Sequence, residues 1–154
     1  MEQRLIKLNY EHEQSEKYLK SKSEIDGKYI WDLGLISKET FYSRKPKLVN
    51  RMNIFILYDS IGCLRCYEFH RSNLLSKIGP ENIIVIYNRE LKFIKRDFRK
   101  ARIINLEKRE VKYNQLILLV NSSGRIVYSD FPQYQLIKNR SEEFYRIVSR
   151  YFEK

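Results

Sequence analysis

The fold follows from one stretch, Asn53-Ile-Phe-Ile-Leu-Tyr58, Asp59-Ser-Ile-Gly62 and Cys63-Leu-Arg-Cys66, which also holds the only two cysteines of the chain. An apolar run of strand length ends in a short turn, and the cysteines follow where a helical pattern begins. A helix N-terminus carries partial positive charge and unpaired N–H groups, so it would lower the pKa of the Cys63 thiol. Cys66 lies one turn further along the same side and could close a disulfide with Cys63. The pattern therefore predicts a redox dithiol.

The chain after this stretch predicts an α/β fold. A helix over Cys63–Ile78 has apolar residues at steps of four and stops at Gly79-Pro80. A second buried strand over Asn82–Tyr87 completes a βαβ unit with a right-handed crossover. The remaining predicted elements are a helix at residues 89–101, a hairpin of Gln115–Val120 with Arg125–Ser129, and a terminal helix that Ser141 caps.

The N-terminal third has weaker patterns, and we expect a helical and hairpin extension over residues 1–47, ahead of a domain over residues 48–154. Residues Glu2–Lys22 are highly charged and predict a solvated amphipathic helix, with a mobile arm as the alternative. Lys28–Ile36 alternates enough to predict a strand, and Thr40–Tyr42 could pair with it as a hairpin.

Composition bounds the class of protein. The chain has 154 residues, 43% of them hydrophobic, which suits one globular unit with a core. Two cysteines are too few for a disulfide scaffold. No run approaches the roughly 20 apolar residues of a membrane helix, and the first residues lack the apolar segment of a signal peptide. We therefore expect a soluble chain, with membrane anchoring only if an N-terminal segment has been removed.

With these elements in order, residues 48–153 resemble the thioredoxin fold. The hairpin Leu116-Ile-Leu-Leu-Val-Asn-Ser-Ser-Gly-Arg-Ile-Val127 is similar to that of the redoxin branch, which includes thiol–disulfide proteins of the bacterial envelope. The resemblance implies a central mixed sheet, with Cys63 as exposed nucleophile and Cys66 as buried resolving thiol. It also implies a disulfide-containing or dithiol protein partner, no bound cofactor and an extracytoplasmic location, with the cytoplasm left open.

Three positions depart from the family pattern. Gly62 stands where an aromatic residue usually precedes the first cysteine, and Leu57 where thioredoxin has a buried carboxylate. Asn114 or Gln115 stands where most members have a cis-proline, which keeps a backbone group free for substrate and bars metal from the dithiol. We expect Gly62 and Gln115 to support the dithiol, together with Arg65, whose charge would further lower the pKa of Cys63.

Other interpretations of these residues stay open. The cysteines could be a structural thiol pair, or with His70 they could form half of a metal site at spacing i, i+3, i+7. Ser60 stands three residues before Cys63, as in a thiol peroxidase, although one such match is weak.

The charge of the chain raises a different class of function. The formal net charge is +11, and many of the cations fall on the predicted helix over residues 89–101. A solvated helix face explains this, and nucleic acid is an unlikely partner because no recognised binding motif accompanies the charge. The alternative to an oxidoreductase is thus a non-catalytic binding module of thioredoxin fold that docks a partner through its basic surface.

Overall fold

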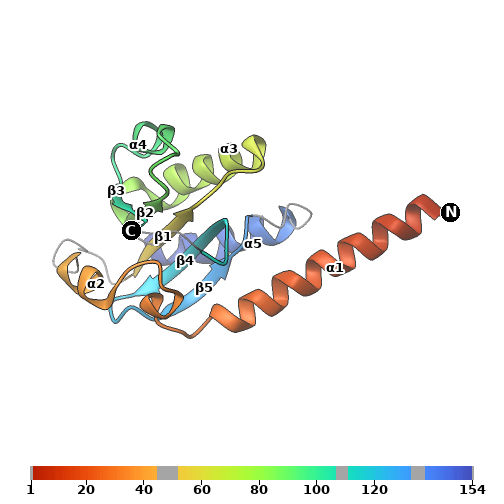
Figure 1. Cartoon of the computed structure of the whole chain (residues 1–154), viewed down its shortest axis with the longest axis horizontal. Coiled ribbons are helices and arrows are strands. Elements are labelled where there is room, and N and C mark those ends of the chain that lie inside the picture. The colour runs from red at the N-terminus through yellow and green to blue at the C-terminus, as the bar shows by residue number, and fades with distance from the viewer. Residues whose placement is uncertain (1, 45–51, 107–110, 133–137, 154) are drawn as a thin grey trace.

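A mixed five-stranded sheet forms the centre of the protein in the computed structural model, which describes residues 2–44, 52–106, 111–132 and 138–153 (Figure 1). The strands, in the order β3-β2-β1-β4-β5, are β1 (Met52–Tyr58), β2 (Ile83–Tyr87), β3 (Arg102–Asn105), β4 (Gln115–Asn121) and β5 (Ile126–Asp130). Strand β1 pairs with β2 in parallel and with β4 in antiparallel orientation. This arrangement confirms the predicted βαβ unit, hairpin and mixed sheet, and the fold is thioredoxin-like.

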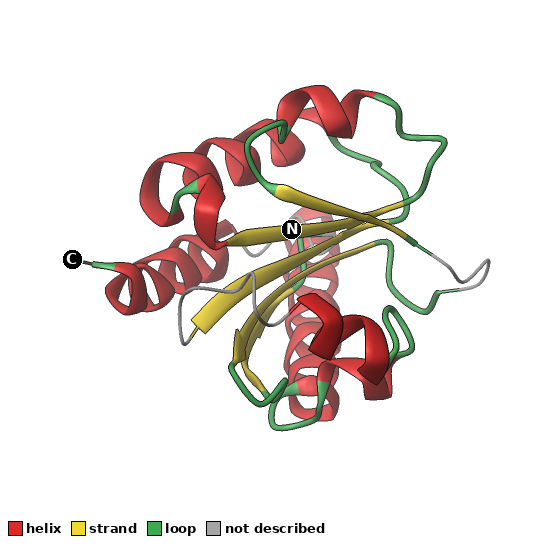
Figure 2. Ribbon diagram, turned by 90° about the vertical axis from the view of Figure 1, so that its left-hand side faces the viewer, coloured by secondary structure: helices red, strands yellow, loops and turns green. Residues whose placement is uncertain are grey.

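Helices cover both faces of this sheet, as Figure 2 shows. One face carries α3 (Leu64–Asn73), α4 (Phe93–Asp97) and α5 (Lys138–Ser149), and the other carries the end of α1 (Glu2–Ile25) together with α2 (Lys38–Arg44). In β1, Ile54 and Ile56 pack on the first side, whereas Phe55 and Leu57 pack on the second. Both sides of β1 are buried, and this is why its sequence is continuously apolar.

The predicted N-terminal hairpin is wrong. Within Lys28–Ile36 the chain forms a 3-10 turn over Ile30–Leu33, and Thr40–Tyr42 lies inside α2. Tyr29 makes a single antiparallel bridge with Arg125, after which the chain turns away from the sheet. The apolar spacing arises because buried side chains dock this loop onto the sheet, among them Ile30, Leu35, Ile36 and Phe41.

Two further predictions need correction. The helix expected over residues 89–101 is only the short α4, and the chain then forms β3, an edge strand that the pattern did not predict. Helix α5 begins at Lys138, so Ser141 lies within the helix and does not cap it. The Ser141 hydroxyl instead donates a hydrogen bond to buried Asp130 at 2.8 Å, which ties α5 to β5.

The predicted N-terminal extension contributes to the core. Tyr18, Ile25 and Phe41 belong to the same apolar cluster as Phe55 of β1. By contrast, residues 2–10 of α1 are exposed, and this part of the helix projects away from the sheet (Figure 1). No helix in the described part of the chain combines the length and apolarity needed to cross a membrane. A domain boundary near residue 47 stays a prediction.

Candidate active site

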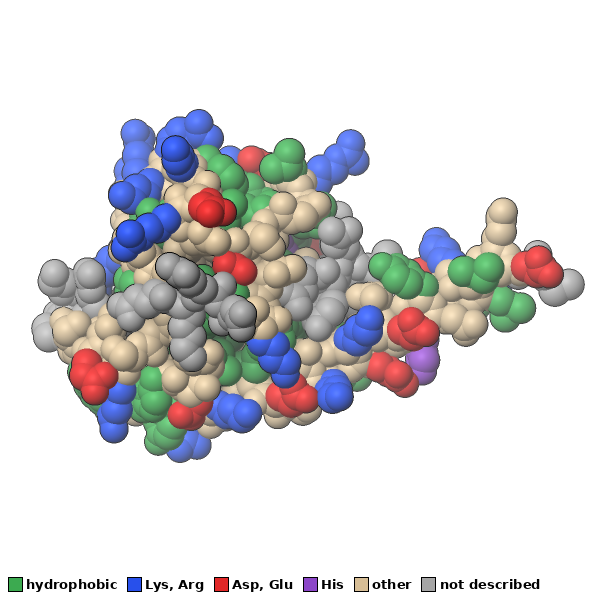
Figure 3. Space-filling view, in the orientation of Figure 1, with side chains coloured by type: hydrophobic (Ala, Val, Ile, Leu, Met, Phe, Trp, Pro, Cys, Tyr) green, Lys and Arg blue, Asp and Glu red, His purple; other side chains and the backbone are tan. Residues whose placement is uncertain are grey.

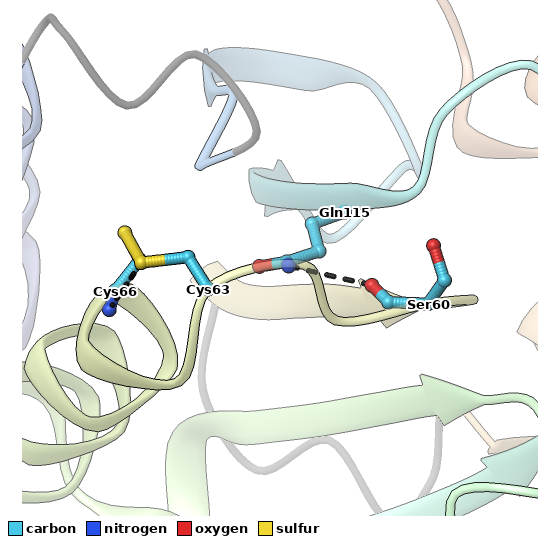
Figure 4. The surroundings of a disulfide bond; sticks show 4 residues. All are labelled: Ser60, Cys63, Cys66 and Gln115. Carbon is cyan, nitrogen blue, oxygen red and sulfur yellow. Dashed lines mark hydrogen bonds between the residues drawn. A yellow bond between two sulfur atoms is a disulfide. The ribbon is translucent and has the colours of Figure 1, made fainter.

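The dithiol lies at the carboxyl end of β1, where the chain enters α3 (Figure 4). Cys63 is the N-cap of this helix in extended conformation, and its Sγ atom accepts a hydrogen bond from the Cys66 backbone N–H at 3.1 Å. The two cysteines form a disulfide, with their Cα atoms 5.3 Å apart. The structure thus shows the pairing and the helix position that the spacing predicted.

Access to the dithiol comes from its position at the rim of the fold. Cys63 and Cys66 are both half-buried, so the expected contrast between an exposed and a buried cysteine is absent from this oxidised state. Between them, Leu64 is 73% exposed and Arg65 is exposed. A partner that reaches the disulfide would therefore meet one apolar and one cationic side chain beside it.

Polar contacts from neighbouring strands hold the turn before Cys63. The Asp59 backbone N–H donates to the Asn114 carbonyl at 2.8 Å, and the Gln115 side-chain amide donates to the Ser60 carbonyl at 3.3 Å (Figure 4). Asn88, just after β2, donates to the Asp59 carboxylate at 3.2 Å. The resemblance in sequence would place a cis-proline at Asn114 or Gln115, and the described residues contain no cis peptide bond. The Gln115 amide supports the turn backbone next to the dithiol.

A buried aromatic group supports the first turns of α3. Tyr67, next to Cys66, packs edge-on against Tyr58 of β1 with ring centroids 5.4 Å apart. Its hydroxyl donates to the Asp97 carboxylate at 2.6 Å, which joins α3 to α4. Burial, and then the hydrogen bond to Asp97, raise the pKa of Tyr67, and burial raises that of Tyr58. Both phenols are therefore protonated at neutral pH, which fits packing and not proton transfer.

His70 lies in the core, away from the ligand role that its spacing suggested. A hydrogen bond of 2.6 Å joins its Nδ1 atom to the Tyr145 hydroxyl of α5, and the side chain is buried. Burial lowers the pKa of His70 to about 4, so the ring is neutral at physiological pH. The described residues contain no group of three or more His, Cys, Asp or Glu side chains suited to a metal.

The buried His70 predicts a loss of stability in acid. In an unfolded chain the histidine pKa is near 6.5, and in the folded protein it is about 4. As pH falls between these values, only the unfolded chain gains the proton, so the free energy of unfolding should fall by roughly 3 kcal/mol. Urea unfolding at pH 7.5 and at pH 4.5 measures this loss, and His70→Gln should remove most of it.

The control for this experiment is His12→Gln, because the His12 side chain is 73% exposed on α1. This variant should keep the acid loss. Burial also raises the pKa of Asp130, which acts in the opposite sense because the folded state then binds its proton first. The comparison of His70→Gln with the parent protein cancels the Asp130 contribution. If His70→Gln lost as much stability in acid as the parent protein does, His70 would not be the cause of the acid loss.

Two hydrogen bonds of the site, Asp59–Asn88 and Tyr67–Asp97, were not predicted from the sequence, although the sequence contains a basis for the first. Asp59 follows β1 and Asn88 follows β2, and parallel neighbours end at the same edge of a sheet. The Asp59–Asn88 bond could have been expected on that ground. The Tyr67–Asp97 bond had no comparable signal, because it depends on how the short α4 packs on α3.

Comparisons with known proteins give likenesses of structure alone. No family model matches the chain, and neither does any curated protein sequence. One similar solved structure is the exposed lipoprotein thioredoxin of Streptococcus pneumoniae strain TIGR4, at 10% identity and a TM-score of 0.40, over 64% of this chain and 89% of that one. Another is a thiol:disulfide interchange protein from Bacteroides sp., at 17% identity and a TM-score of 0.43, over 79% and 86% respectively. At these values we draw no function from either structure.

Proposed function

We propose that this protein is a thiol–disulfide oxidoreductase that exchanges disulfides with protein partners through Cys63 and Cys66. The observation that carries the proposal is the closed Cys63–Cys66 pair at the start of α3, with the Cys66 N–H directed at the Cys63 sulfur. In the reduced protein the same N–H would stabilise a Cys63 thiolate, because a hydrogen bond to the charged form favours that form. Half-burial leaves the pair accessible to another protein.

The reaction needs two exchange steps. The Cys63 thiolate attacks one sulfur of a substrate disulfide, which breaks the substrate bond, forms a mixed disulfide and releases one substrate thiolate. The Cys66 thiolate then attacks the Cys63 sulfur, which releases the second substrate thiolate and closes the Cys63–Cys66 disulfide. Two electrons pass from the protein to the substrate. With a dithiol substrate the same steps run in reverse.

Positive charge around the motif favours the protein as an oxidant, which takes electrons from its substrate. The start of α3 and the exposed Arg65 both place positive charge near Cys63. A lower thiol pKa stabilises the reduced form, which makes the pair a stronger oxidant than a typical thioredoxin. Gly62 and Gln115 would support this chemistry indirectly, Gly62 as the exposed residue before Cys63 and Gln115 through the Ser60 carbonyl. No cofactor is required by these steps.

A redox titration against glutathione tests the proposal. The thiols are trapped by alkylation at each potential and counted by mass spectrometry. We expect a single two-electron transition between roughly −300 and −120 mV, in the upper part of that range if Arg65 and the helix lower the pKa of Cys63. A pair that stays oxidised or stays reduced across the whole range would contradict it. That result would favour the alternative, a binding module in which Cys63 and Cys66 take no part in disulfide exchange.

The place of action stays a prediction. The resemblance of the sequence to envelope thiol–disulfide proteins favours an extracytoplasmic location, where substrates with disulfides are common. Alkylation of the protein in intact cells with a membrane-impermeant thiol reagent, after mild reduction, would test this location.

A further inference from the structure

A basic cleft lies over the ends of β2 and β3. It has a volume of about 450 Å³ and is lined by Tyr87, Arg89, Lys92, Lys95 and Asn105. Its three cations are exposed, and Figure 3 shows Lys and Arg side chains gathered over α4 and its surroundings. None of the described residues that line this cleft is acidic.

The cations of the basic cleft are free to meet a ligand. None of Arg89, Lys92 and Lys95 forms an ion pair within the described residues. The larger hollow between α3 and α4, of about 510 Å³, is different because Asp97 lies in its lining. Arg96 in that hollow contacts Asp97 at 3.3 Å, and Arg71 contacts Glu68 at 2.7 Å. The basic cleft therefore differs from this hollow in that no carboxylate is among its described lining residues, although Arg99 and Lys100 of the hollow also form no described ion pair.

The basic cleft shares an edge of the sheet with the dithiol. Tyr87 is in register with Tyr58, the last residue of β1, and Asn105 is in register with Tyr87. Neighbouring strands lie about 4.8 Å apart, so two strand spacings place the cleft roughly 10 Å along this edge from the end of β1. The Asn88–Asp59 hydrogen bond directly joins the turn before the dithiol to the chain segment that carries Arg89.

We infer that the basic cleft binds an acidic segment of the partner protein whose thiol or disulfide exchanges with Cys63. This inference rests on the proposed function, and it names the class of substrate. An extended chain rises about 3.3 Å per residue, so the acidic residues of the partner would lie about three to five residues from its reacting cysteine. Leu64, which is 73% exposed, would contact the partner beside the disulfide. Complementary charge of this kind favours both encounter and choice of partner.

The experiment compares two synthetic peptides, each with one internal disulfide. The first carries Asp and Glu three to five residues from a cysteine, and the second carries Asn and Gln at the same positions. The double variant Lys92→Glu/Lys95→Glu reverses the charge of the cleft. The control, Lys17→Glu/Lys20→Glu, makes the same change of net charge on exposed positions of α1, far from the cleft along the chain.

We expect the parent protein to exchange with the acidic peptide on the order of tenfold faster than with the neutral one at low salt, and this preference should shrink as salt is added. The cleft variant should lose the preference, whereas the α1 variant should keep it. Equal rates for the two peptides in the parent protein would overturn the inference. A preference that survives in the cleft variant would overturn it as well.

A binding assay separates this inference from the proposed function. The oxidised protein is titrated with labelled versions of both peptides in which serine replaces cysteine, so that no exchange takes place. Tighter binding of the acidic version, lost in the cleft variant, supports the cleft even if the redox titration fails. A single-stranded DNA of equal charge is the competitor. If it binds the cleft more tightly than the acidic peptide does, the assignment to an acidic protein segment is overturned.

Discussion

Cys63→Ser is expected to abolish disulfide exchange, and Cys66→Ser is expected to stop it one step later with the substrate still attached. Serine cannot supply the thiolate that attacks the substrate, so the first variant should show no turnover. In the second variant Cys63 can still attack, but no second thiol can release the mixed disulfide. Turnover of a disulfide peptide measures the first effect, and mass spectrometry without reductant measures the covalent adduct.

The two variants control for each other, because both remove the same disulfide and differ only in the sulfur that remains. An adduct on Cys63 in Cys66→Ser, with none on Cys66 in Cys63→Ser, would assign the roles as proposed. The opposite pattern would exchange the roles of the two cysteines. This result is informative because both residues are half-buried in the oxidised protein, and exposure alone does not distinguish them.

The centre of the fold could be predicted because its local signals are strong and agree with one another. Strand β1 is a continuous apolar run buried on both faces, and Gly79, with φ of 94°, ends the helical stretch before Pro80. The hairpin of β4 and β5 follows from two apolar runs around a polar turn with Gly124. Each of these elements forms where its own residues favour it, and the sheet adds to that preference.

The elements that were missed depend on contacts with distant parts of the chain. The loop after Tyr29 is held by buried Ile30 and by packing of Trp31 on Phe41, with ring centroids 5.6 Å apart. Strand β3 has only four residues, and its burial comes from pairing with β2. The periodicity of the sequence shows that such residues are apolar, but it does not show which surface they pack against.

In the candidate site, too, the features set by neighbouring residues could be predicted, and those set by distant contacts could not. The spacing of Cys63 and Cys66 and the helix start are local, and the sequence was enough to place them. His70 shares a helix face with Cys66 in the sequence, yet its hydrogen bond to Tyr145 spans 75 positions and gives it a structural role. Four residues of the basic cleft, Tyr87, Arg89, Lys92 and Lys95, fall within nine positions, and the cations among them were visible in the sequence. Their grouping with Asn105 of β3 was not, because it depends on the pairing of β2 with β3.

Deleting residues 2–27 is expected to unfold the protein or to lower its melting temperature by roughly 10–20 °C, whereas deleting residues 2–10 should change it by about 2 °C or less. Residues 2–10 are exposed on the projecting part of α1. The longer deletion removes the buried side chains of Tyr18 and Ile25 from the face of the sheet. Each such side chain contributes about 1.5–3 kcal/mol by its burial.

The polar contacts of this region add to the expected effect of the longer deletion. The Tyr18 hydroxyl donates to buried Asp130 at 3.3 Å, and the Lys22 ammonium donates to the Ser129 carbonyl at 2.9 Å. Their loss would leave a buried carboxylate with fewer donors, which costs about 1–3 kcal/mol more. The sum is comparable to the whole stability of an ordinary domain. Thermal unfolding followed by circular dichroism measures both deletions.

Point variants separate these side chains from the helix as a whole. Tyr18→Ala with Ile25→Ala should reproduce much of the loss, and Leu5→Ala with Leu8→Ala should have little effect because both leucines are more than half exposed. If the longer deletion kept the parent melting temperature, residues 2–27 would be an appendage that the sheet does not need. A large loss would instead show that the fold begins within α1, because Tyr18 and Ile25 are buried in the same apolar cluster as Phe55 and Leu57 of β1.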